Sequence, residues 1–202
     1  MTVDPSTRAG RATDRALRLG LLAVAVAGLR RRDPGAFVNA LVGFAATFLP
    51  DVLERRTVLS VRPRHRVWVS AASLLHAIGM LGPYDETWWW DHLTHLCSAS
   101  LVGTAAHLFA RRRGHDTTRT VLAATLGLGV LWEAMEYAVH RTARRFGLEP
   151  LLVTYGPRDT ALDLVFDALG GLCVVAFGDR LLGDRLLEDV VEDEKGTAAR
   201  GD

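Results

Sequence analysis

The feature that most constrains this chain is a series of apolar stretches separated by short links in which most of the charged residues are concentrated. The stretches cover about residues 16–29, 35–50, 67–83, 88–110, 118–140 and 159–177 or slightly beyond. They are apolar on all sides, and their many Gly, Ala and Ser residues allow helices to pack closely in lipid. We therefore predict an all-α fold, a polytopic transmembrane helix bundle with about six spans.

A soluble helical bundle is the alternative, because several stretches are shorter than the ~20 residues that cross a hydrocarbon core. The overall composition does not decide, since 23% charged residues would also fit a soluble protein. Aromatic residues favour the membrane. Tyr84, Trp88, Trp89 and Trp90 gather at one end of an apolar stretch, as side chains at a membrane interface do.

The 202 residues are expected to form one domain. We predict an N-terminal cytoplasmic segment (1–15), the transmembrane bundle (16–183) and an acidic, disordered cytoplasmic tail (184–202). A net charge of +1 without a concentrated basic face argues against a nucleic-acid partner. Membrane lipid is the expected surrounding, and the oligomeric state is not predicted.

The arginine distribution predicts the orientation. The link 82–90 contains no Lys or Arg, whereas the links 54–66 and 111–119 each contain several. By the positive-inside rule, link 82–90 faces outward and both termini are cytoplasmic, as in a multi-pass protein of the cell (plasma or inner) membrane. The arginines of links 30–32 and 141–158 oppose this orientation, because it places them outside.

Ionisable residues interrupt the last three stretches, where they are costly in lipid and mark candidate functional sites. Most members of each set are three or four residues apart, which places them on one face of a helix. The sets are Asp91, His92 and His95; Glu133, Glu136 and His140; and Asp159, Asp163 and Asp167.

The predicted topology brings these three sets together. The fourth stretch enters from outside, the fifth leaves there and the sixth re-enters, so the sets lie at similar depth in the outer half of the bundle. The first and third sets lie within roughly 10–12 Å of the outer surface. His76 and Asn39 are placed to join them. Carboxylates this close in a low dielectric need protons, an arginine such as Arg158, or a divalent metal to balance them.

Carboxylates together with imidazoles suit Zn, Mn or Fe. The predicted metal ligands are Asp91, His95, Glu133, Asp159, Asp163 and Asp167. Glu136 and His92 are the predicted general bases toward a metal-activated water.

Simpler roles stay open for several of these residues. Asp91 and Asp159 can cap the helices that they begin, and Asp167 can hydrogen-bond a neighbouring helix. His107 and His115 lie near the cytoplasmic arginines and are expected to be inert.

Three functions follow from these observations, and whether the chain is an enzyme is left open. The first is an intramembrane metal-dependent hydrolase acting on a lipid or other amphiphile at the outer leaflet. The second is a proton- or ion-coupled transporter, against which stand the lack of an inverted repeat and of acids in the inner half other than Asp51. The third is a structural membrane protein whose polar cluster only locks helices together.

Three ordered motifs carry a family resemblance: WDHLTH at residues 90–95, LWEAME at 131–136 and DTALDLVFDALG at 159–170. Through them the chain resembles the YjdF-like family of inner-membrane proteins of bacteria and archaea, over roughly residues 35–180. The resemblance implies a polytopic membrane protein and implies no particular reaction.

Overall fold

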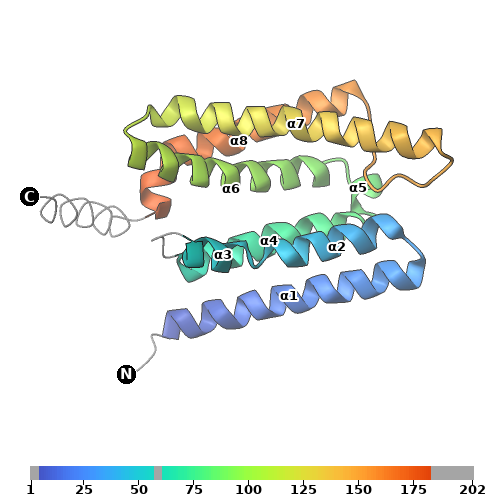
Figure 1. The fold of residues 1–202 in the computed structure, drawn as a ribbon, viewed down its shortest axis with the longest axis horizontal. Coiled ribbons are helices and arrows are strands. Elements are labelled where there is room, and N and C mark those ends of the chain that lie inside the picture. Colours follow the sequence, from blue (N-terminus) through green and yellow to red (C-terminus); the bar gives the residue numbers. More distant parts are fainter. Residues whose placement is uncertain (1–4, 57–60, 183–202) are drawn as a thin grey trace, which may run out of the picture.

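The part of the chain that the computed structural model describes, residues 5–56 and 61–182, forms helices joined by short links and contains no strand (Figure 1). The helices are α1 (Pro5–Arg31), α2 (Pro34–Ala46), α3 (Leu49–Arg56), α4 (Pro63–Gly79), α5 (Pro83–Glu86), α6 (Trp90–Arg113), α7 (Thr117–Arg145) and α8 (Pro157–Leu182). The all-α fold class is confirmed. The predicted acidic tail, residues 184–202, lies outside the described residues.

Local sequence signals explain where these helices begin and end. Proline occupies the first position of α2, α4, α5 and α8, where its missing N–H costs no hydrogen bond. Asp33 caps α2 by accepting a 2.9 Å hydrogen bond from the Ala36 amide, and Asp116 caps α7 through the Arg119 amide. Gly114 ends α6 with a φ of 65°, a left-handed conformation that glycine adopts without strain.

The long helices form two groups that lie side by side (Figure 1). In one group α1 packs on α2 and α4; in the other α6 packs on α7 and α8; contacts between α4 and α6 join the two. One end of the bundle, called here the α5 end, contains α5 and the α1–α2 and α7–α8 links. At the opposite end α1 starts, α8 finishes and the α6–α7 link turns. Consequently α6 and α8 run in the same direction.

Small residues allow close contact between α6 and α8. A Cβ atom at Gly170 would lie 2.7 Å from the Leu96 carbonyl oxygen and 3.1 Å from the Ser100 amide nitrogen. Only glycine therefore fits at this crossing, as expected for helices that pack in lipid.

Apolar side chains cover the outside of the helices, whereas ionisable ones lie within the α6–α7–α8 group. Leu131 and Val130 of α7 and Leu172 of α8 are exposed, while Asp163 and His92 are buried. This is the reverse of a water-soluble bundle and fits a protein surrounded by lipid. Four segments, Pro34–Arg56, Trp90–Arg113, Thr117–Arg145 and Pro157–Arg180, are long and apolar enough to cross a membrane.

The first and third predicted spans correspond to α1 and α4, which are not among these four segments. The 17 residues of α4 extend about 25 Å, slightly less than a ~30 Å hydrocarbon core. The first half of α1 carries Arg8, Arg11 and Arg15. Both helices nevertheless lie alongside the others in the bundle (Figure 1).

The predicted aromatic belt is divided in the structure. Trp88 and Trp89 are exposed at the α5 end, as expected of interfacial residues. Trp90 and Tyr84 instead turn inward. The Trp90 indole donates a 3.2 Å hydrogen bond to the Leu75 carbonyl, and the Tyr84 hydroxyl contacts His76.

Candidate metal centre

The three predicted sets of ionisable residues meet at the α5 end, between α6, α7 and α8. Helices α6 and α8 begin at the α5 end and α7 ends there. Because each set lies near that end of its helix, the three sets lie at similar depth in the bundle. His92, His95, Glu133, Asp163 and Asp167 are buried there. Asp91 and Asp159 are half-buried beside them.

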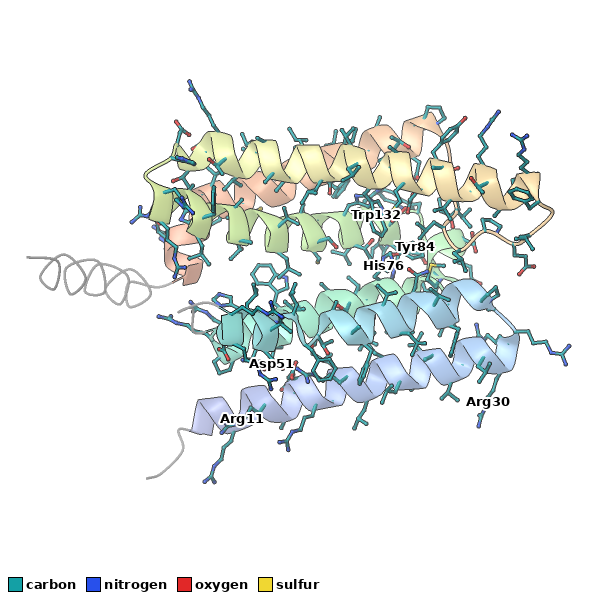
Figure 2. The ribbon with its side chains drawn as sticks, in the orientation of Figure 1. Arg11, Arg30, Asp51, His76, Tyr84 and Trp132 are labelled. Carbon is teal, nitrogen blue, oxygen red and sulfur yellow. The ribbon has the colours of Figure 1, made fainter. Side chains whose placement is uncertain are left out.

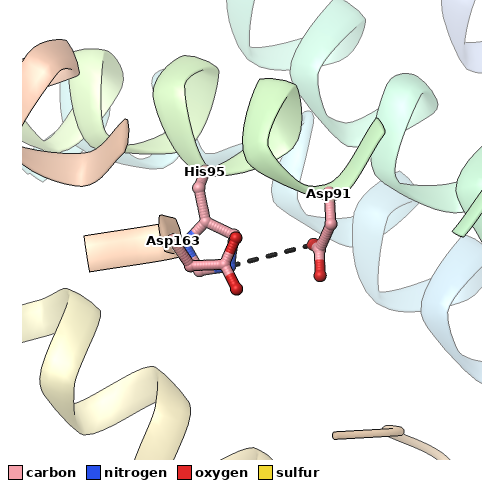
Figure 3. A group of neighbouring side chains, drawn as sticks. All are labelled: Asp91, His95 and Asp163. Atoms are coloured by element: carbon pink, nitrogen blue, oxygen red, sulfur yellow. Dashed lines mark ion pairs between the residues drawn. The ribbon is translucent and has the colours of Figure 1, made fainter. Parts of the chain in front are cut away.

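His95 lies close to carboxylates from α6, α7 and α8, and Figure 3 shows it with two of them, Asp91 and Asp163. Its Nδ1 atom is 3.2 Å from Asp167 Oδ1 on α8. Its Nε2 atom faces two further carboxylates, at 3.6 Å from Glu133 Oε1 on α7 and 3.8 Å from Asp91 Oδ1 on its own helix. The ring is thus held on one side and faces acidic oxygens on the other.

The Nε2 distances are too long for direct hydrogen bonds, yet they match the separation of two ligands of one ion. Donor atoms about 2.1 Å from a tetrahedral zinc lie about 3.4 Å apart. Asp91, His95 and Asp163 each offer a ligand atom, and these atoms lie within 4.8 Å of one another.

Glu133 is 9% exposed, and its two oxygens differ in their contacts. Oε2 accepts a 2.7 Å hydrogen bond from the Thr160 hydroxyl. Oε1, the atom that faces His95, is buried and accepts no hydrogen bond. Its contact is with His95 Nε2 at 3.6 Å, so this oxygen keeps its capacity to accept a hydrogen bond or to bind a cation.

His92 and Asp163 form a second buried pair, with 2.7 Å between Nδ1 and Oδ1. The His92 ring stacks on Phe166 at 5.1 Å between centroids, and Trp88 contacts it edge-on. Asp163 is only 1% exposed. His92, Asp159 and Asp163 form another group whose ligand atoms lie within 4.8 Å of one another, so Asp163 belongs to both groups.

Asp167, predicted as a metal ligand, lies behind His95 and orients its ring through Nδ1. Its other oxygen, Oδ2, is buried against α7 and accepts no hydrogen bond. A Cβ atom at Gly129 would overlap Oδ2 and lie 3.0 Å from Asp167 Cγ. Gly129 therefore provides the space in which Asp167 reaches His95, a contact that the sequence did not indicate.

The remaining residues of the α7 set have different surroundings. Glu136 lies one turn after Glu133 and accepts a 3.0 Å hydrogen bond from the Trp132 indole. His140 lies farther along α7 and accepts a 3.4 Å hydrogen bond from the Thr154 amide in the α7–α8 link. His140 therefore stabilises the link.

The helix capping considered for Asp91 is not what the structure contains. Trp89 is the N-cap residue of α6 and makes no side-chain capping bond. Asp91 is one position inside the helix, where its Oδ1 accepts a 3.4 Å hydrogen bond from the Thr94 hydroxyl.

Tyr84 and Thr94 extend the cluster toward the α1–α2–α4 group, and the sequence did not single them out as site residues. The Tyr84 hydroxyl lies 2.5 Å from His76 Nδ1 and donates a 3.3 Å hydrogen bond to the Thr94 hydroxyl. His76 Nε2 lies 3.3 Å from Asn39 Oδ1. His76 and Asn39 are thus linked to the cluster through Tyr84 and Thr94. Figure 2 shows His76 of α4 near Trp132 of α7, with 5.9 Å between their ring centroids.

The α7–α8 link lies over the α5 end. The Tyr155 hydroxyl donates a 2.8 Å hydrogen bond to Asp85 of α5, and the Leu151 carbonyl accepts one from Asn39 of α2. Partial burial and the Asp85 carboxylate raise the pKa of Tyr155. The phenol consequently stays protonated at physiological pH, and this contact keeps its donor.

A second charged network lies at the opposite end, between α1, α3 and α4 (Figure 2). Arg18 contacts Asp14 at 2.9 Å and donates a hydrogen bond to the Thr47 carbonyl, and Ser70 donates one to Asp14. Arg66 pairs with Asp51 and Glu54. The expectation that Asp51 is the lone acid of this half was wrong, because Asp14 and Glu54 belong to helices that extend beyond the apolar stretches.

His107, expected to be inert near the arginines, is buried in the α6–α8 interface and lies 3.0 Å from Asp179 Oδ1. It repeats the pairing of His92 with Asp163 and of His95 with Asp167. The partners are 71 or 72 residues apart in all three pairs. The constant spacing follows from the parallel direction of α6 and α8.

The lipid-facing apolar surface and buried ionisable interior define an integral membrane protein of the helical-bundle class. The sequence matches the predicted membrane protein family DUF2238 over residues 14–184, and the chain belongs to this family. The membrane-protein resemblance is thereby confirmed. An uncharacterized protein of Thermotoga maritima is 28% identical over 144 residues, which cover 67% of this chain and 70% of that relative. No solved structure matches the chain.

Proposed function

We propose that this membrane protein binds a divalent transition-metal ion (Zn, Mn or Fe) at the α5 end. His95 Nε2, Asp91, Glu133 and an oxygen of Asp163 are the ligands. The observation that carries the proposal is Glu133 Oε1, which is buried, accepts no hydrogen bond and lies 3.6 Å from His95 Nε2. An ion between the two atoms would satisfy both.

The charge of the cluster supports a cation. Among the described residues, the ion-pair partners of Asp91, Glu133, Asp163 and Asp167 are histidines. The nearby Arg158, considered earlier as a counter-charge, is exposed and pairs with none of them. Several carboxylates in a medium of low dielectric need compensating positive charge, and the two histidines, His92 and His95, are fewer than these four carboxylates.

We further propose metal-dependent hydrolysis of a lipid or other amphiphile as the reaction. A divalent metal supplies Lewis-acid activation of water at neutral pH. Glu136, one turn from Glu133 on α7, would accept the proton, and Thr160 and Asp167 hold Glu133 and His95 in position. The substrate class rests on the site's placement within a lipid-surrounded bundle.

The proposed orientation places the α5 end outside the cell membrane and both termini in the cytoplasm. The link 111–119 and the arginines that flank residues 57–60 (Arg55, Arg56, Arg62, Arg64 and Arg66) lie at the opposite end, which supports this orientation. The substrate would then approach from the outer leaflet.

Proton- or ion-coupled transport is the second candidate, and the charged network at the opposite end is the observation that favours it. That network, however, belongs to α1, α3 and α4. Between the two ends of α6, the Ser100 and Thr104 hydroxyls donate to carbonyls of their own helix. These groups do not form a polar path from one end to the other, so hydrolysis is the better supported function.

Metal content tests the proposal. The full-length protein, purified in mild detergent, should contain near-stoichiometric transition metal by elemental analysis, or take it up from Zn or Mn solutions. Glu133→Gln, which keeps the shape of the side chain, should lose most of it. His107→Gln is the matched control, because it alters a buried α6 histidine at the opposite end, and it should keep the metal.

Absence of metal from the wild type after incubation with Zn and Mn would overturn the proposal. Equal metal in wild type and Glu133→Gln would overturn the assignment of the site. If metal is bound, release of lipid fragments from phosphatidylethanolamine–phosphatidylglycerol vesicles, measured by mass spectrometry, should depend on it. No metal-dependent release would argue against lipid hydrolysis.

A further inference from the structure

The two groups of candidate ligands share one residue. Asp91, His95 and Asp163 form the first group, and His92, Asp159 and Asp163 form the second. We propose that the centre holds two divalent transition-metal ions side by side, with the Asp163 carboxylate bridging them. This inference rests on the proposed metal-binding function and extends it to a second ion.

Asp163 is suited to a bridging position. A carboxylate has two oxygens, each able to accept more than one interaction, so one aspartate can contact two cations. Asp163 projects from α8 between His92 and the His95 group, and it is 1% exposed, so its direction is set by packing. Ions in two-metal sites lie about 3.5–4 Å apart. Within each group the ligand atoms lie within 4.8 Å of one another, and both groups contain Asp163, so the two ions would be neighbours at such a spacing.

Charge balance favours two ions over one. Asp91, Glu133, Asp159 and Asp163 line the centre and Asp167 lies behind His95, so these five carboxylates carry five negative charges when ionised. One divalent ion would leave three of these charges uncompensated in the bundle. Two divalent ions would leave one. Glu133 Oε1, which is buried and accepts no hydrogen bond, lies 3.6 Å from His95 Nε2 and so belongs to the first of the two positions.

The second ion also assigns a role to His92. The stacking on Phe166 and the edge contact with Trp88 hold the imidazole in one plane beside Asp163. Histidine with carboxylates is a ligand set that Zn, Mn and Fe accept. His92 is then a ligand of the second ion, which leaves Glu136 as the proton acceptor. Asp159 completes the group from the first turn of α8.

Stoichiometry of Mn²⁺ binding tests this directly. The full-length protein in mild detergent is stripped with a chelator, reloaded with Mn²⁺ and freed of excess. Bound metal is then measured by elemental analysis and by electron paramagnetic resonance. The wild type should hold two Mn²⁺ per chain and give the spectrum of an exchange-coupled pair.

Asp159→Asn is the diagnostic variant, because Asp159 is half-buried and the change preserves its shape. It should retain one Mn²⁺ with the six-line signal of an isolated ion. His92→Gln should behave in the same way, and the matched His107→Gln should keep two coupled ions. An unchanged size-exclusion profile establishes that the variants are folded.

One Mn²⁺ in the wild type, unchanged in Asp159→Asn, would overturn the two-ion centre and leave the single-metal function intact. Two ions retained in Asp159→Asn would overturn the assignment of the second ligand group. No Mn²⁺ in any form would overturn both the two-ion centre and the proposed function.

Discussion

Gly129 sets the geometry of the centre although it carries no functional group. Its hydrogen atom faces the buried Oδ2 of Asp167, and Asp167 in turn holds His95 Nδ1. A residue behind a histidine ligand commonly changes metal affinity 10–100-fold when it is altered. The absence of one methyl group on α7 therefore determines how His95 on α6 is oriented.

We predict that Gly129→Ala displaces Asp167 and weakens metal binding by about tenfold or more. The methyl group would overlap Oδ2 of a carboxylate that has little room to move, and such overpacking costs about 1–3 kcal/mol of stability. Isothermal titration with Mn²⁺ and thermal unfolding in detergent measure the two effects.

Gly127→Ala is the control for this prediction. It lies one half-turn away on α7, and a Cβ there meets no atom within 4 Å. Metal affinity should be unchanged, and stability should be equal or slightly greater, since alanine favours a helix by roughly 0.5–1 kcal/mol over glycine. Equal metal affinity in both variants would contradict the role given to Gly129.

Among the helices, α1 is attached to the bundle by charges as well as by apolar packing. Leu21, Val24 and Ala25 of α1 form an apolar core with Ala40 and Ala77. Toward the opposite end this core gives way to the network of Arg18 with Asp14 and Thr47. Arg18 also lies 4.4 Å from the centroid of the Phe48 ring, an additional cation–π contact.

We predict that Arg18→Leu destabilises the protein by about 3–5 kcal/mol, because it leaves the buried Asp14 carboxylate without its counter-charge. The double variant Arg18→Leu with Asp14→Leu should recover most of that loss, since two apolar residues can replace a buried ion pair at little cost. Thermal unfolding in detergent measures both. Arg15→Leu, at an exposed position on the same helix, should have little effect on the free energy of unfolding. If the double variant loses as much stability as the two single variants added together, the pairing of Arg18 with Asp14 is contradicted.

On the scale of the whole molecule, the bundle separates two polar regions. The acidic centre belongs to α6, α7 and α8 at the α5 end, and the paired charges belong to α1, α3 and α4 at the opposite end. Among the described residues, the acids of the first region pair with histidines, whereas those of the second pair with arginines. The first therefore suits a bound cation, and the second suits attachment of helices.

The proposed orientation makes a labelling prediction for intact bacterial cells. With Cys97 and Cys173 replaced by Ala, Glu86→Cys at the α5 end should react with a membrane-impermeant maleimide. His115→Cys in the α6–α7 link should react only after the cells are opened. Both positions are exposed, so a difference reports the side of the membrane. The reverse pattern would place the centre on the cytoplasmic side.

The sequence was sufficient to predict which ionisable residues lie close together, but not how individual side chains are oriented. The meeting of Asp91, Glu133 and Asp163 followed from chain direction, because successive spans alternate sides. Tyr84 was assigned to an interfacial belt, whereas its hydroxyl faces His76. Composition near an interface does not tell which way a ring rotates, since that depends on the helix packed beside it.

The sequence by itself determined the class of the protein and the end of the bundle where its ionisable residues gather. Helical hydrogen bonds and apolar spans depend on residues close in the chain, so both can be recognised locally. Only the tertiary structure decided that His95 pairs with Asp167 and His92 with Asp163. Such pairs join residues about 70 positions apart, and the rotation and register of α8 against α6 depend on close packing at residues such as Gly170.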